Sequence, residues 1–396
     1  MVQKRGVFQV TALDLVAGIG LAAWIYLLLF NGGFWLSNER EESEENKYAT
    51  PKVWPRVTAV IPARNEADML PSSLTSLVKQ DYPGEFSIVL VDDQSTDGTA
   101  DIALAIAANS NRDVTVVNGA PLPGGWTGKV WAMHQGIAKA SSSEAPPEYL
   151  LLTDADIGYR SDVLKSLVVS ATENGRAMTS VMAKLKCESL AERWLVPAFI
   201  FFFEMLYPFS KVNRKADRTA AAAGGCMLVN RTALERAGGI AAIRGALIDD
   251  CALGKLLKTQ GPIWLGLSDR VLSLRVYETF EDIRRMVARS AYAQLRYSPI
   301  LLAGTVIAML VIYIAPPALA VFAGYPANML GAAAYLLMFI AYQPTLRFYN
   351  RSPLWGFALP LIATAYVGFT LDSAYQHLRG RGGLWKGRVQ AEVGRQ

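Results

Sequence analysis

Long apolar runs stand at both ends of the chain, on either side of a central segment with a different pattern. The first run, residues 10–30, contains one acid, Asp14, near its outer end and is long enough to cross a bilayer. No small-residue cleavage site precedes the acidic stretch at 39–45, so the pattern indicates a retained anchor and not a signal peptide. We expect residues 1–47 to form this anchor and an acidic linker.

The last quarter of the chain contains further membrane candidates. Three apolar segments occur there, at about residues 299–322, 327–342 and 354–371. Pro316 and Pro317 interrupt the first and the second is short, which leaves one of the three open to being re-entrant. We expect two or three membrane segments within 299–374, followed by a basic tail at 375–396.

The segment 48–298 alternates short β-rich apolar runs with helical stretches, which is typical of βαβ units around a mostly parallel sheet. Strands are expected at 57–62, 86–91, 114–117 and 149–153. Helices are expected at 67–80, 99–108 and 129–140. A stretch of about 250 residues is large enough to bury its own core, so we predict one α/β domain.

Composition agrees with this division of the chain. Hydrophobic residues make up 52% and charged residues 18%, against about 25% charged in an average soluble domain, and mean hydropathy is +0.22. The three cysteines (Cys187, Cys226, Cys251) are far apart and only two histidines are present, which argues against a disulfide framework or a zinc site. The net charge of +5 without a basic block beside aromatic residues gives no support to nucleic-acid binding.

Acidic side chains follow three of the predicted strands at their ends. Glu66 follows the first strand, Asp92 and Asp93 the second, and Asp154 and Asp156 the fourth. Ligands of open α/β sheets bind beyond the carboxyl ends of the strands, so these acids should meet at one rim. Asp154 and Asp156 can offer oxygen ligands to Mg²⁺ or Mn²⁺, which keeps open positions for substrate phosphates.

With these elements in order, the chain resembles the family 2 glycosyltransferases, whose nucleotide-sugar domain has the GT-A fold. The matching segments within 55–300 are residues 60–66, 91–99, 128–136, 153–156, 224–229 and 248–254. The anchor, residues 125–129 and 294–298, and the apolar C-terminal region most resemble the bacterial hopene-associated glycosyltransferases. The resemblance implies an α/β GT-A domain flanked by transmembrane helices.

The resemblance also implies roles for individual residues. Those matched to nucleotide-sugar binding are Pro62, Arg64, Glu66, Asp92, Asp93, Lys129, Asp154, Arg289 and Arg296. Asp156 matches the principal ligand of a Mg²⁺ or Mn²⁺ ion, and Asp154 contacts ribose or metal. Asp250 matches the general base, with Asp249 as the adjacent alternative, because a carboxylate can take the proton of an acceptor hydroxyl. Both acids also suit the start of a helix over 251–258.

Other residues keep two interpretations. Lys129 follows a glycine-rich turn and either reaches a phosphate or is a solvated lysine. Arg296 and Tyr297 stand where many relatives carry the Arg-Trp of Q-x-x-R-W, and Gln294 is displaced by one position, which disfavours a processive polysaccharide synthase. Residues 194–209 are apolar but short, and we expect an interfacial helix beside the active site, with a buried helix as the alternative.

These features predict a membrane-bound inverting glycosyltransferase that moves a sugar from a nucleotide-diphosphate donor to a lipid hydroxyl, with a hopanoid-pathway lipid favoured. Ceramide- or polyprenyl-phosphate-type acceptors and a catalytically silent nucleotide-sugar-binding scaffold are alternatives. Because such donors are cytoplasmic, the catalytic domain is expected on the cytoplasmic face of a bacterial inner membrane, where the positive-inside rule also places the basic tail. Four full crossings would put both termini on one side, and Lys4 and Arg5 also disagree with an outside N-terminus.

Overall fold

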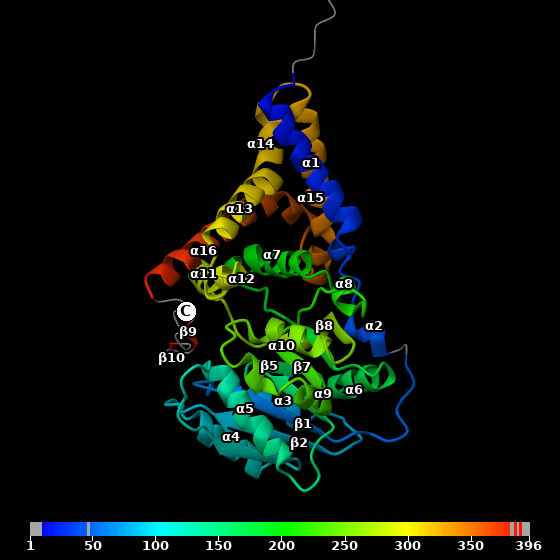
Figure 1. Cartoon of the computed structure of the whole chain (residues 1–396), viewed down its shortest axis with the longest axis vertical. Helices are drawn as coiled ribbons and strands as arrows, with labels where there is room; N and C mark the ends of the chain where they lie inside the picture. The colour runs from blue at the N-terminus through cyan, green and yellow to red at the C-terminus, as the bar shows by residue number, and fades with distance from the viewer. Residues whose placement is uncertain (1–9, 46–47, 381–383, 386–387, 390–396) are drawn as a thin grey trace, which may run out of the picture.

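The computed structural model describes residues 10–45, 48–380, 384–385 and 388–389, and it has an α/β domain at one end and a bundle of apolar helices at the other (Figure 1). The strands of the main sheet are β1 (Val57–Ala63), β2 (Phe86–Asp92), β3 (Asp113–Asn118), β4 (Tyr149–Thr153), β5 (Ile157–Tyr159), β6 (Met178–Lys184), β7 (Cys226–Asn230) and β8 (Ile263–Ser273). The helices of this domain are α2 (Glu41–Glu45), α3 (Leu70–Val78), α4 (Thr99–Ala108), α5 (Gly128–Ser141), α6 (Val163–Glu173), α8 (Phe209–Asn213), α9 (Arg231–Arg236) and α10 (Asp249–Lys258).

The sheet has the order β3-β2-β1-β4-β7-β6-β8-β5. The pairs β1–β2, β1–β4, β2–β3 and β6–β8 are parallel, and the pairs β4–β7, β6–β7 and β5–β8 are antiparallel. The prediction of a mostly parallel α/β sheet is therefore confirmed. Because successive side chains of a strand point to opposite faces, Val60 of β1 joins the core that contains Met133 of α5, while Ala59 joins the core that contains Leu74 of α3.

The predicted strands and helices lie within a few residues of the observed ones, with one difference at the start of α3. This helix begins at Leu70 and not at Ala67. The preceding loop is held open by side chains of the next strand–helix loop: Glu66 N donates to Thr99 Oγ1 at 2.9 Å and Ala67 N donates to Asp97 Oδ2 at 3.0 Å. The loop is thereby fixed at the rim where the acids were expected.

Within the described residues, four helical stretches are long and apolar enough to cross a membrane: Ala12–Phe30, Pro299–Phe322, Ala327–Phe348 and Pro353–Leu378. They contain α1 (Ala12–Phe30), α13 (Pro299–Met309), the π-helical turn η3 (Leu310–Ile314), α14 (Ala315–Phe322), α15 (Ala327–Phe348), the 3₁₀ turn η4 (Pro353–Ala358) and α16 (Leu359–Leu378). The fully buried Trp24 joins α1 to η3 by donating to the carbonyl oxygen of Ile312 at 2.8 Å.

The last apolar stretch does not run the length of the bundle. After α15 the chain turns back along it, so that Tyr335 donates to the carbonyl oxygen of Phe357 at 2.8 Å and the rings of Phe339 and Phe357 lie 4.4 Å apart. From there α16 descends toward the α/β domain, where Ser373 accepts from Tyr292 N at 3.0 Å (Figure 1). The C-terminal end of α16 thus lies on the side of the α/β domain. The N-terminal residues Lys4 and Arg5, and most of the basic tail, are outside the described residues.

Between the two parts lie α7 (Leu190–Leu206), α11 (Phe280–Ala288) and α12 (Ala291–Gln294) (Figure 1). The sequence favoured an interfacial position for α7, but the structure buries most of this helix. Phe202 packs edge-on against Tyr313 of η3 and Tyr366 of α16, with ring centroids 5.6 and 5.0 Å away. At its other end, Glu192 Oε1 accepts from Tyr277 N, after β8, at 2.8 Å, so α7 links the bundle to the α/β domain.

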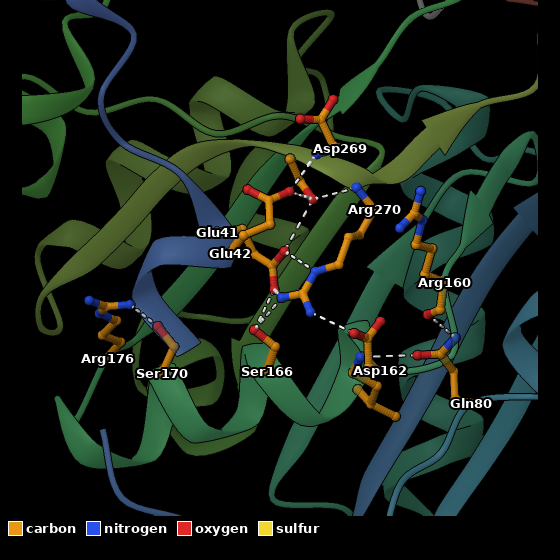
Figure 2. Close-up of polar contacts among 12 residues, drawn as sticks. Glu41, Glu42, Gln80, Arg160, Asp162, Ser166, Ser170, Arg176, Asp269 and Arg270 are labelled. Atoms are coloured by element: carbon orange, nitrogen blue, oxygen red, sulfur yellow. Dashed lines mark hydrogen bonds and ion pairs between the residues drawn. The ribbon is translucent and has the colours of Figure 1, made fainter. Parts of the chain in front are cut away.

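A buried polar cluster attaches the chain after α1 to the sheet (Figure 2). Glu41 of α2 is 2% exposed and receives two hydrogen bonds from Arg270 of β8, at 3.0 and 2.6 Å. Ser166 of α6 also donates to Glu41, and Arg270 donates to Asp162 at 2.7 Å. Burial raises the pKa of Glu41, and the Arg270 hydrogen bonds oppose that effect. The buried charges of Glu41 and Arg270 therefore stabilise each other.

We expect Arg270→Met to lower the free energy of unfolding by about 3–5 kcal/mol, because it leaves the Glu41 carboxylate buried without its cation. Denaturant unfolding of the full chain in detergent measures this. The matched control is Asp269→Asn, which removes the ion pair of an exposed Asp269 with Lys184 and should cost less than about 1 kcal/mol. Equal losses of unfolding free energy in Arg270→Met and Asp269→Asn would contradict a stabilising role for the buried pair of Glu41 and Arg270.

Candidate active site

The first part of the rim is formed by the loops after β1 and β2. Arg64 donates to the backbone carbonyl oxygens of Asp93 and Gln94, and its guanidinium lies 3.9 Å from the Asp93 carboxylate. Asp92 is 7% exposed and its Oδ2 accepts from Ser95 N at 3.2 Å, while Oδ1 has no hydrogen-bond partner in the described part of the chain. Asp92 thus keeps acceptor capacity for a ligand.

Lys129 connects two acidic segments that are far apart in the sequence. It lies in the first turn of α5, and its Nζ is 2.7 Å from Asp154 Oδ1 and 3.2 Å from Asp249 Oδ2. Burial opposes the charge of Lys129, but Asp154 and Asp249 outweigh it and raise the pKa of the ammonium group. The interpretation of Lys129 as a solvated surface residue is therefore wrong.

Asp156 is held by an arginine that the sequence analysis did not name. Arg275, just after β8, donates to Asp156 Oδ2 at 2.8 Å and to both oxygens of Glu66, at 3.0 and 3.2 Å. A basic residue two positions after β8 was the available signal, but nothing in the sequence placed that strand end beside the segment that follows β4. The pairing joins the loop after β1 to the Asp154–Asp156 segment.

Asp250 occupies the first turn of α10, as the sequence predicted for the start of this helix. Its Oδ2 accepts from Gly224 N at 3.0 Å and its Oδ1 from Cys251 N at 2.7 Å. A Cβ atom on Gly224 would lie 3.2 Å from Lys129 Nζ and 3.3 Å from Asp250 Oδ2, so this close approach favours glycine. Burial and the neighbouring Asp249 raise the pKa of Asp250 to about 6.

A cavity of about 640 Å³ extends from these charged groups into the apolar helices. Lys129, Asp154, Asp249 and Asp250 line its polar end. Its other walls come from α7, α13, η3 and α16, through residues such as Phe202 and Met309. No residue of α13 is buried, so that helix separates the cavity from the outside of the bundle with little packing behind it.

The other predicted binding residues lie at different distances from this centre. Arg289, the residue that follows α11, lines the cavity. Pro62 is buried within β1, one residue before its end. Arg296 is exposed after α12, where it has a left-handed backbone with φ of 53°, and it is not among the described residues that line the cavity. Its predicted role stays a prediction.

The donor set at Asp154 and Asp156 suits a hard divalent cation. Within the described residues no group of three or more His, Cys, Asp or Glu side chains could hold a metal. Mg²⁺, however, is often bound by one or two carboxylates together with substrate phosphates. Asp154 and Asp156 face Lys129 and Arg275, which are cations of the kind that also bind phosphate.

Comparisons with known proteins agree with this arrangement. Residues 58–238 match the family model described as glycosyl transferase family 2. The chain is similar to a 4,4'-diaponeurosporenoate glycosyltransferase of Staphylococcus aureus (strain bovine RF122 / ET3-1), with 33% identity over 113 residues, which are 28% of this chain and 27% of the relative. With the enzyme of that name from Staphylococcus haemolyticus (strain JCSC1435), identity is 29% over 167 residues, or 42% of this chain and 40% of the relative. The chain thus matches less than half the length of these relatives.

A solved structure is similar over almost the entire chain. The mannosyltransferase PcManGT from Pyrobaculum calidifontis, in complex with GDP-Man and Mn²⁺, aligns with a TM-score of 0.57 and 20% identity, covering 91% of this chain and 99% of that protein. At this identity the likeness concerns the fold. The α/β domain of this chain has the GT-A fold and belongs to glycosyl transferase family 2.

Proposed function

We propose that the protein is a membrane-bound glycosyltransferase that moves a sugar from a nucleotide-diphosphate donor to the hydroxyl of a membrane lipid. The observation that carries this proposal is the cavity, which joins the acids Asp154 and Asp250 to the apolar helices. A lipid can place its apolar body among these helices while its hydroxyl reaches Asp250. The resemblance of residues 125–129 and 294–298 to the hopene-associated enzymes favours a hopanoid-type acceptor.

In this proposal the donor lies along the rim of the sheet. Asp92 and Asp93 accept hydrogen bonds from the nucleoside, and Lys129 and Arg275 are within the charged cluster that faces the diphosphate. Mg²⁺ or Mn²⁺ held by Asp154 and Asp156 would neutralise charge on the diphosphate. Arg289 approaches from the cavity wall.

Asp250 is the proposed base of the transfer. The acceptor oxygen attacks the anomeric carbon as the bond from that carbon to the diphosphate breaks, and the hydroxyl proton passes to Asp250. The sugar is thereby transferred with inversion. Asp249 is the weaker candidate because its carboxylate is paired with Lys129 at 3.2 Å, and an ion pair makes a carboxylate a poorer proton acceptor.

Membranes containing the protein should label one lipid class when they are incubated with labelled nucleotide sugars, and added Mn²⁺ or Mg²⁺ should support the transfer. Asp156→Ala should reduce transfer at least about 100-fold, because several kcal/mol of charge stabilisation are lost. Asp113→Ala, at an exposed acid on β3, is the matched control and should transfer normally. If no nucleotide sugar labels a lipid, the glycosyltransferase proposal fails; a scaffold would also keep its cellular role after Asp156→Ala.

The acceptor-dependent rate should fall about tenfold per pH unit below pH 6, because the base form of Asp250 is lost as pH drops through a pKa of about 6. Asp250→Asn should lower the rate about 10²- to 10⁴-fold at pH 7.5. Asp249→Asn should keep measurable activity and move the acidic limb to lower pH, since Asp249 raises the pKa of Asp250. A larger loss of transfer rate in Asp249→Asn than in Asp250→Asn would mean that Asp249, and not Asp250, is the base.

We further propose that the α/β domain faces the cytoplasm of a bacterium and that the N-terminus is outside. The path of α16 supports this, because its C-terminal end, where the basic tail begins, lies on the side of the α/β domain, as the positive-inside rule requires. A compartment-sensitive reporter fused after Gln396 should therefore report the cytoplasm, and one fused before Met1 the opposite side. Finding both reporters on the same side of the membrane would mean that α16 crosses the bilayer completely.

A further inference from the structure

A tyrosine and a glutamine meet in the cavity beside Asp250. Tyr207 follows α7, and its ring packs against Phe203 with centroids 5.2 Å apart. Gln294, the last residue of α12, donates from Nε2 to the Tyr207 hydroxyl oxygen at 2.5 Å. Both side chains line the cavity. The segment after α7 and the end of α12, whose contacting residues are 87 positions apart, therefore hold the Tyr207 hydroxyl group in place.

The Tyr207 hydroxyl group still has a hydrogen to donate. Because Gln294 supplies a donor, the Tyr207 oxygen accepts and its own hydrogen is left to donate. The neighbouring groups are the thiol of Cys251 and the carboxylate of Asp250, and a thiol sulfur accepts hydrogen bonds poorly. Burial raises the pKa of Tyr207 to about 12, so the group stays protonated at neutral pH. An oxygen atom in the cavity would be a better partner than the sulfur.

The charges of the cavity are distributed unevenly. Among the described residues that line it, the acids are Asp154, Asp249 and Asp250 and the cations are Lys129 and Arg289. Lys129 is shared between Asp154 and Asp249. The three carboxylates thus outnumber the two cations, so an oxyanion beside Asp250 and Tyr207 meets an excess of negative charge.

We propose that Tyr207, held by Gln294, binds the acceptor oxygen, and that this corner selects a neutral lipid alcohol over a lipid carboxylate or phosphate. The inference rests on the proposed function and narrows its acceptor. A hydroxyl can donate to Asp250 while its oxygen accepts from Tyr207, which aims a lone pair at the donor sugar. An oxyanion has no proton for Asp250 and meets a like charge there, which weakens binding.

The first test uses the full chain in detergent and compares Tyr207→Phe with wild type. This change keeps the ring packing and removes only the hydroxyl, so we expect kcat/KM for a lipid alcohol to fall about 5- to 10-fold, as for one neutral hydrogen bond. The KM for the nucleotide sugar and its slow hydrolysis without acceptor should not change. The matched control is Tyr82→Phe, which removes a hydroxyl bonded to the carbonyl oxygen of Pro55, outside the cavity.

The second test leaves the protein unchanged and varies one atom group of the acceptor. A C20 isoprenoid alcohol, the matching carboxylic acid and the matching monophosphate share one apolar body. We expect transfer to the alcohol to exceed transfer to either acid by at least about 100-fold, because the anion meets a like charge at Asp250.

The outcomes separate this inference from the function on which it rests. Equal transfer to the alcohol and the acids, or wild-type kinetics in Tyr207→Phe, overturns the inference and leaves glycosyl transfer to a lipid intact. Loss of donor hydrolysis in Tyr207→Phe also overturns it, since the residue would then act on the donor. If wild-type protein transfers sugar to none of the lipid probes or native lipids, the proposed function itself is wrong.

Discussion

The ion pairs of Lys129 are the interaction on which the arrangement of the site depends. Three carboxylates from two distant segments, Asp154, Asp249 and Asp250, line one end of the same cavity. Their mutual repulsion would drive α10 away from the end of β4, but the ammonium group between Asp154 and Asp249 offsets it. The same contact fixes the relation between the metal-side acids and the acid proposed as base, because α5 carries Lys129 to both.

Local pattern was sufficient to predict β1 to β4 and the acids that follow β1, β2 and β4, but it did not predict β5 to β8. An apolar run followed by Asp92-Asp93 or by Asp154-Ala155-Asp156 is a signal contained in a few consecutive residues. Parallel strands bring such ends to one edge of the sheet. Arg275 and Tyr207 were not predicted, because their places depend on pairing across the sheet and on the packing of α7. Composition also could not distinguish α16 from a complete crossing, since the contact of Phe357 with Tyr335 decides its path.

The excess of apolar residues has two functions in this fold. Part of it covers both faces of the sheet, where Val60 and Ala59 enter different cores. The rest forms helices that are exposed on their outer side, such as α13, whose Ile300 and Ile307 are 83% and 61% exposed. The cavity lies where these two apolar regions meet through α7, so the polar end of a sheet opens toward surfaces suited to lipid. The side chains of α7 thus lie between the α/β domain and the apolar helices.

The bond between Glu41 and Arg270 links residues 229 positions apart. During synthesis, α1 and Glu41 leave the ribosome first, and the arginine that neutralises this carboxylate follows after nearly the whole α/β domain. Until β8 is in place, Glu41 lacks the cation that its buried position requires. The membrane anchor and the last long strand of the domain therefore complete one structural unit together, and a chain that ends before β8 lacks the contact that seats the domain on its anchor.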